Sequence, residues 1–155
     1  EILRCLVGSE MCIRDRDRKR YGIVVQKSVA ENTTMATLEK FMSGPFIDKK
    51  KENKIAQEYV EQLATKTPGT DQLVVNLSGG NQQKVVIAKW LTRDCDILIF
   101  DEPTSGLDYK NMESVAEILS ALSKRGKAIL VISHDNELLM KICSRVIRVD
   151  ERTSS

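Results

Sequence analysis

The sequence predicts an α/β fold in which a helical region precedes a parallel β-sheet. Two apolar runs of strand length, at residues 96–100 and 127–133, show no alternation with polar residues, which is typical of strands buried on both faces of a sheet. Amphipathic helical patterns separate and follow these runs, as expected where strands and helices alternate. Residues 29–91 carry only helical periodicity. The 155 residues suffice for one domain at most.

Three helices are expected in the first part of the chain. The apolar residues of 29–42 recur at helical spacing, and the Ser-Gly-Pro of residues 43–45 ends that helix. A second amphipathic face covers residues 55–63 and ends before the Thr-Pro-Gly of residues 67–69. The third helix lies within residues 77–91, where apolar stripes again follow helical spacing.

Strands and helices alternate in the second part. Residues 96–100 predict a strand, and the apolar positions of 112–122 mark a helix. A second strand is expected at 127–133, a short helix at 136–142 and a last strand at 145–149. This order predicts that the strands lie parallel in one sheet.

Composition argues against several classes of function. The 24 basic and 22 acidic residues are interspersed and give a net charge of +2, which indicates neither a nucleic-acid partner nor an anionic membrane surface. No apolar run approaches the roughly 18 residues that a membrane-spanning helix needs. The four cysteines have no metal-ligand spacing and no secretory segment precedes them, so we expect reduced thiols.

The first sixteen residues are unlike the rest. Residues 6–16 read LVGSEMCIRDR, which resembles the translation of a transposase-based sequencing-library adapter. The alternative is a short strand at residues 1–7 followed by a charged turn. We expect residues 1–16 to be a non-native leader outside the fold, and the native sequence to start near Asp17.

Two carboxylates follow the first strand-like run. Asp101 and Glu102 stand at its carboxyl end, where open α/β sheets bind ligands. An aspartate there can hold Mg²⁺, usually through water. Glu102 points differently, because side chains alternate along a strand, and can take a proton from an attacking water. A strand that ends in Asp-Glu is common, so this interpretation depends on the Gly-Gly at 79–80 upstream and on residues 104–108 downstream.

Two further features suit a phosphate. A serine and two glycines open the helix after Leu77, and backbone N–H groups at a helix start favour an anion. The sequence nevertheless contains no GxxxxGK[ST], the loop that would hold a nucleotide's own phosphates. His134 is the only histidine and follows the second strand-like run. A lone histidine is more often structural, but this place favours contact with a transferring phosphate.

These residues resemble the motifs of the ATP-binding cassette (ABC) ATPases, and the resemblance covers essentially all of residues 17–149. Residues 97–102 resemble the Walker B strand, with Asp101 as the Mg²⁺ residue and Glu102 as the catalytic glutamate, and His134 resembles the catalytic switch histidine. The residues that resemble the signature motif, which binds the partner's nucleotide, are Leu77, Ser78, Gly79, Gly80, Asn81 and Gln82. Those that resemble the D-loop are Ser105, Gly106, Leu107 and Asp108.

The resemblance implies a partial P-loop NTPase fold. It places a helical and signature subdomain at residues 17–92, a catalytic core that lacks the Walker A strand at 93–149, and a tail at 150–155. It implies ATP and Mg²⁺ as cofactors and ATP hydrolysis by the full-length parent, with an inactive isolated fragment. Two such domains form a head-to-tail dimer, so the signature residues would serve the partner's nucleotide. Asp101, Glu102 and His134 would face the chain's own.

The form LSGGNQQK, with Asn81, and the upstream residues 17–22 are similar to the second ATPase half of bacterial sugar importers of the ribose, galactose and xylose type. That similarity implies transmembrane permease subunits, an indirect solute-binding protein in the periplasm or outside the cell, and no nucleic acid. It also implies a peripheral place on the cytoplasmic face of the bacterial membrane. The glutamine-loop position of these proteins falls on Arg16, so that loop is cut.

Two residues depart from the sugar-importer pattern. Those second halves usually have arginine in place of Ser105 and lack the switch histidine, here His134. Residues 107–112 and the pair His134-Asp135 resemble instead the ATPases of energy-coupling-factor importers for vitamins and metals. The alternatives are therefore an ATPase of that type, or a chimera joined near residues 101–104. A soluble non-transport ABC ATPase would usually carry basic arms or inserted domains, and none is visible.

Overall fold

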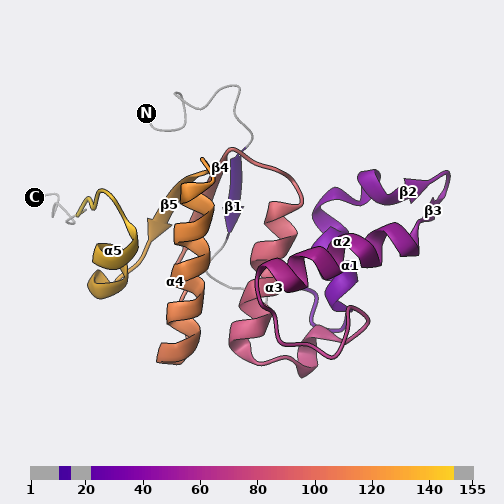
Figure 1. Cartoon of the computed structure of the whole chain (residues 1–155), viewed down its shortest axis with the longest axis horizontal. Helices are drawn as coiled ribbons and strands as arrows, with labels where there is room; N and C mark the ends of the chain where they lie inside the picture. Colours follow the sequence, from indigo (N-terminus) through magenta and orange to yellow (C-terminus); the bar gives the residue numbers. More distant parts are fainter. Residues whose placement is uncertain (1–10, 15–21, 149–155) are drawn as a thin grey trace, which may run out of the picture.

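The computed structural model describes residues 11–14 and 22–148, which form a helical part beside a small parallel sheet (Figure 1). The helical part consists of α1 (Val29–Thr34), the 3₁₀ helix η3 (Met35–Phe41), strands β2 (Met42–Ser43) and β3 (Phe46–Ile47), α2 (Lys49–Gln62), η4 (Val74–Asn76) and α3 (Gly79–Leu91). The sheet part consists of β1 (Met11–Arg14), β4 (Ile97–Asp101), α4 (Tyr109–Lys124), β5 (Ala128–Ile132) and α5 (Asn136–Ile142).

The three-stranded sheet has the order β1-β4-β5, and both of its pairings are parallel. β4 and β5 run in register from Ile97 opposite Ala128 to Asp101 opposite Ile132. Leu98 and Phe100 of β4 are buried in one apolar cluster with side chains of α4. The register places the carboxyl ends of β4 and β5 side by side, with Asp101 opposite Ile132.

α3 connects the two parts of the molecule (Figure 1). Val85 and Val86 belong to an apolar cluster of the helical part. Ile87 and Ala88 belong to the cluster that contains Leu98 of β4. Because successive residues of α3 are buried in two different cores, this helix is held on both sides. The start of α3 is therefore fixed relative to the sheet.

β1 contradicts the expectation that residues 1–16 lie outside the fold. The backbone of β1 pairs in parallel with β4, from Met11 opposite Ile97 to Arg14 opposite Phe100. β4 thus has a strand on each side, which satisfies its backbone N–H and C=O groups. Within the described residues β1 and β5 are the two edge strands of this sheet.

Other elements also differ from the sequence prediction. The helix expected at 29–42 is divided, because Thr37 leaves helical geometry at φ −145° and ψ 38° inside η3. An antiparallel hairpin, β2–β3, follows it, so the region is not wholly helical. The last predicted strand is absent: residues 145–148 form no strand, and Val149 lies outside the described residues. Cys95 is disulfide-bonded, against the expectation of reduced thiols, whereas Cys143 is free.

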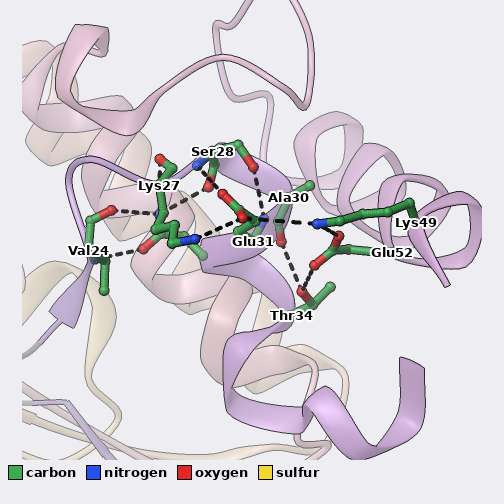
Figure 2. Close-up of polar contacts among 9 residues, drawn as sticks. Val24, Lys27, Ser28, Ala30, Glu31, Thr34, Lys49 and Glu52 are labelled. Atoms are coloured by element: carbon green, nitrogen blue, oxygen red, sulfur yellow. Dashed lines mark hydrogen bonds and ion pairs between the residues drawn. The ribbon is translucent and has the colours of Figure 1, made fainter. Parts of the chain in front are cut away.

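Polar contacts hold α1 against α2 (Figure 2). Ser28 and Glu31 form a capping box at the start of α1, each side chain accepting the other's backbone N–H. Glu52 of α2 is 1% exposed, and its carboxylate accepts hydrogen bonds from the Thr34 hydroxyl and the Lys49 ammonium, both at 2.8 Å. A carboxylate buried without such partners would be strongly destabilising, so this pair of contacts makes the α1–α2 packing specific.

None of the helices formed by residues 22–148 has the length and apolar character required to span a bilayer.

Candidate functional site

The first half of the candidate site lies where β4 and β5 end. Asp101 is the last residue of β4, and the backbone N–H of Glu102 donates to the carbonyl of Ile132 at 2.8 Å. Glu102 has φ +47°, in the left-handed region that a residue with a Cβ rarely adopts. Such strain is maintained only where the surroundings determine it, and it often marks a functional position. It ends the strand and turns Glu102 toward the residues after β5.

The carboxylate of Glu102 is held by those residues. Its Oε1 accepts the backbone N–H of His134 at 2.9 Å, and its Oε2 accepts the Ser133 hydroxyl at 3.4 Å. The Glu102 side chain is 14% exposed, whereas the His134 side chain is 88% exposed, with Nε2 at 3.7 Å from Oε1. The structure therefore brings Glu102 and His134 together. An oriented carboxylate beside solvent can accept a proton from water.

The D-loop residues, 105–108, form a compact connection from Glu102 to α4. The backbone N–H of Ser105 donates to the Glu102 carbonyl, and that of Leu107 donates to the Thr104 carbonyl. Gly106 has φ +68°, which favours glycine at this position. Asp108 is the N-cap of α4. The loop thus carries the chain directly from the strained glutamate to the next helix.

The second half of the candidate site is the signature turn, residues 78–80, at the start of α3. The Ser78 side chain does not cap the helix. Its hydroxyl oxygen instead accepts Nδ2 of Asn81 at 3.0 Å, and Oδ1 of Asn81 accepts the backbone N–H of Lys66 at 2.9 Å. Asn81 therefore connects the turn to the loop that follows α2.

Two signature side chains point inward. Gln82 is 9% exposed, and its Nε2 donates to the carbonyls of Val74 and Leu77 at 3.1 Å each. Leu77 is equally buried, in the apolar cluster of the helical part. These two side chains anchor the turn, and Ser78 and Asn81 are the signature side chains that line the neighbouring cleft.

A cleft of about 510 Å³ lies between the starts of α3 and α4. Its lining includes Ser78 and Asn81 from the signature side and Asp108 and Asn111 from the α4 side. Its charges balance, with Lys66, Lys84 and Lys110 against Asp108, Glu113 and Glu117. Burial is the chief cause that lowers the pKa of Lys84. Asp101, Glu102 and His134 do not line this cleft. The predicted site residues therefore form two separate groups, with Asp108 on the signature side.

Sequence reasoning missed three residues of these groups, Ser133, Asn111 and Gln83. Gln83 is 1% exposed, its Nε2 donates to the carbonyl of Pro103, and its Oε1 has no partner within the described residues. One signal could have identified it: Gln83 lies three, four and seven residues before Val86, Ile87 and Trp90, and so lies on the apolar face of its helix. Ser133 and Asn111 carry no such pattern.

The described residues offer limited ligands for a metal. No group of three or more histidine, cysteine, aspartate or glutamate residues comes together among residues 11–14 and 22–148. Asp101, partly buried at the end of β4, could supply one oxygen ligand. This donor set fits a Mg²⁺ ion that takes its remaining ligands from water and from nucleotide phosphates.

Comparison with known proteins gives consistent matches. A family model described as ABC transporter matches residues 7–105, a range that includes part of the leader. A putative ribose/galactose/methyl galactoside import ATP-binding protein of Rhizobium etli is 39% identical over 145 residues, which cover 94% of this chain and 28% of that protein. A ribose import ATP-binding protein of Clostridium perfringens is 39% identical over 146 residues, covering 94% of this chain and 29% of that protein.

A similar import protein of Burkholderia ambifaria is 44% identical over 132 residues, covering 84% of this chain and 26% of that protein. The chain thus spans between a quarter and a third of the length of these relatives. Among solved structures, an ATP-binding cassette dimer in a post-hydrolysis state with ADP and phosphate has a TM-score of 0.70 at 23% identity, covering 90% of this chain and 59% of that one. A second dimeric bacterial cassette has a TM-score of 0.69. The folds correspond.

Proposed function

This chain belongs to the ABC transporter family, and on that premise we propose that it is part of the ATP-binding and hydrolysing subunit of an importer. The solute proposed is a sugar, because relatives at 39–44% identity are named as ribose or galactose import ATP-binding proteins. The alignment with the Rhizobium etli protein covers 94% of the chain and so extends on both sides of residues 101–104. That continuity favours one sugar-importer gene over a chimera or an energy-coupling-factor ATPase.

The proposed assembly follows from the family. The chain would pair head to tail with a second ABC ATPase domain and bind transmembrane permease subunits at the cytoplasmic face of a bacterial membrane. A solute-binding protein would act indirectly, and no nucleic acid is involved. Residues 17–92 would serve as the helical and signature subdomain and residues 93–149 as the catalytic core. Residues 150–155 would be a tail, and residues 1–16 would have a foreign origin as an adapter-like leader, even though residues 11–14 pair with β4.

The position of Glu102 is the observation that carries the proposal. Its carboxylate is oriented by the His134 backbone and the Ser133 hydroxyl, at the end of the strand that also carries Asp101. In this role Glu102 accepts the proton of the attacking water, and Asp101 holds Mg²⁺ through water. When bound, ATP would supply the phosphoryl group and Mg²⁺ would supply positive charge that neutralises its phosphates. The exposed imidazole of His134 can rotate to a transferring phosphate without releasing Glu102.

The second group of residues would act on the partner's nucleotide. Ser78 and Asn81 line the cleft, and Leu77 and Gln82 hold the turn. Gly79 and Gly80 would complete the signature surface. Asp108, with Ser105, Gly106 and Leu107, would form the D-loop surface beside it. Such a division explains why one chain carries two separated groups of site residues.

A graft tests this proposal. The segment of the Clostridium perfringens ribose import protein that aligns with residues 22–148 is replaced by those residues, and ATP hydrolysis and ribose uptake are measured. We expect both activities to be retained. Glu102→Gln in the graft should reduce hydrolysis by about 10²–10⁴-fold and leave ATP binding largely unchanged, because an amide cannot accept the proton. Glu58→Gln, at an exposed glutamate of α2, is the matched control.

Two outcomes would contradict the proposal. A graft that binds its permease but hydrolyses no ATP would refute the assigned activity. A fall of less than about threefold in Glu102→Gln would refute the role of Glu102 as the base. The 155-residue chain alone should release no phosphate from ATP above background, since its sequence has no GxxxxGK[ST]. Magnesium-dependent release that disappears in Glu102→Gln would contradict this.

A further inference from the structure

The signature turn and the D-loop are in contact within this chain, through Asn111 of α4. The backbone N–H of Asn111 donates to Oδ1 of Asp108 at 2.9 Å, and its side-chain Nδ2 donates to Oδ2 at 2.8 Å. Both oxygens of one carboxylate therefore bind the same asparagine. With Nδ2 directed at Asp108, the amide oxygen of Asn111 is placed against Gly80 at the start of α3.

Gly80 has no room for a side chain at this contact. A Cβ atom on Gly80 would lie 2.3 Å from Oδ1, 2.4 Å from Cγ and 2.9 Å from Cβ of Asn111. Rotation of the Asn111 side chain about its Cα–Cβ bond could relieve the first two contacts, but it would break the bond from Nδ2 to Asp108. The third contact is with an atom fixed by the backbone of α4. The close approach of Asn111 thus requires glycine at position 80.

α3 cannot easily move away from Asn111. Gln83, almost one turn after Gly80, is buried and donates to the carbonyl of Pro103 in the loop after β4. Ile87, one turn further, is fully buried in the cluster that contains Leu98. The side of α3 that faces the sheet is therefore held at three successive turns. A shift at Gly80 would disturb the contacts of Gln83 and Ile87.

We propose that Asn111 is a positioning residue that fixes the signature turn relative to Asp108. The two groups would then reach the partner's nucleotide as one rigid surface. The proposal rests on the proposed function, but the contact itself does not. Asn111 belongs to neither the signature nor the D-loop motif, and it would act through Gly80 and Asp108 without touching the nucleotide.

The first test concerns the contact and uses the 155-residue chain. Alanine normally stabilises a helix relative to glycine, so an unconstrained Gly80→Ala should raise the melting temperature. We expect it to lower the melting temperature by about 5 °C because of overpacking against Asn111. In an Asn111→Gly background the effect of Gly80→Ala should change sign. Asn111→Ala keeps α4 helical and serves as a second background. In it, Gly80→Ala should lower the melting temperature by less than in the unsubstituted chain. If Gly80→Ala alone raised the melting temperature of the 155-residue chain, the proposal would be overturned.

The second test concerns the role and uses the graft. Orthovanadate serves as the phosphate analogue, because its inhibitory concentration does not depend on the fraction of protein that is folded. In Asn111→Ala we expect this concentration to rise about tenfold, since a misplaced turn binds the transferring group less well. KM for ATP should stay within about twofold. Asn136→Ala, at an exposed asparagine in the first turn of α5, is the matched control.

The outcomes separate the two proposals. If the Asn111→Ala graft is active and its inhibitory concentration of orthovanadate is unchanged, the role of Asn111 is overturned and the proposed function stays intact. An unsubstituted graft without ATP hydrolysis would overturn the proposed function and the role together. In that case the melting comparison still decides whether Asn111 constrains Gly80.

Discussion

Glu102 accepts a hydrogen bond from the backbone of His134, and the imidazole of the same histidine remains exposed. The N–H···Oε1 distance is 2.9 Å, and Nε2 lies 3.7 Å from the same oxygen. The glutamate is therefore held by the position of residue 134 and not by its side chain. The backbone of residue 134 therefore orients the carboxylate, and the imidazole is left to contact the phosphate. A substitution of His134 can test the second role without removing the first.

His134→Ala should therefore test the imidazole alone. The backbone N–H is retained in alanine, so Glu102 keeps its hydrogen bond. In the graft we expect turnover to fall by about 10²-fold with KM for ATP nearly unchanged, which is typical when one group that stabilises the transferring charge is removed. Steady-state hydrolysis measures this. Turnover within about threefold of the unsubstituted graft would assign the imidazole no part in the reaction.

The strain at Glu102 predicts an inverted preference between glycine and alanine. Glu102 has φ +47°, which costs about 1–2 kcal/mol for a residue with a Cβ and little for glycine. Glu102→Gly and Glu102→Ala both remove the carboxylate, so their difference reports the backbone alone. Urea denaturation should show the glycine variant to be more stable by about 1 kcal/mol. Equal stabilities, or a more stable alanine variant, would indicate that residue 102 relaxes out of this conformation.

The sequence predicted the elements whose apolar pattern is long or sharply bounded. The short helix expected at 136–142 has the bounds of α5, because Asp135 caps its start and helical spacing continues to Ile142. β4 and β5 each lie within one residue of the predicted runs at their ends. The hairpin β2–β3 was missed because strands of two residues carry no periodicity. β1 was missed because residues 1–16 were interpreted as a leader and excluded from the fold.

The candidate site was predicted by motif and not by geometry. The order of residues placed Asp101 and Glu102 at a strand end. It could not show that Glu102 contacts Ser133 and His134, which are 31 and 32 residues away, since that depends on the β4–β5 register. The inward direction of Gln82 likewise depends on how α3 packs. A motif names residues by type and spacing, whereas burial is set by the rest of the fold.

Acidification should weaken the α1–α2 region through Glu31. The backbone hydrogen bond from Ser28, and then the Lys27 ammonium, lower the pKa of Glu31 below its ordinary value of 4.5, against a smaller opposing effect of burial. A carboxyl group with a lower pKa in the folded state stabilises the fold above its unfolded pKa, and this contribution is lost as the pH falls through the folded pKa. The loss should therefore appear below about pH 4.5.

Comparison of Glu31→Gln with the unsubstituted chain measures this contribution. Urea denaturation at about pH 7 and about pH 3.5 should show a smaller loss of stability on acidification in Glu31→Gln. Glu58→Gln is the control, at an exposed glutamate of α2 without a hydrogen bond or ion pair among the described residues. If Glu31→Gln lost as much stability on acidification as the unsubstituted chain, the capping box would contribute nothing to the pH dependence.

The free edge of β5 should make the chain self-associate. Within the described residues β5 has a strand on one side only, and Leu130 and Ile132 are 46% and 51% exposed. An exposed apolar edge strand is a template for pairing with another chain, and a charged side chain on it opposes that pairing. Leu130→Lys should therefore reduce association at micromolar concentration. Light scattering and sedimentation velocity measure this self-association.

Val24→Lys is the matched control, because Val24 is also 46% exposed but lies in the helical part. If both lysine variants reduced association equally, general surface charge rather than the β5 edge would be responsible.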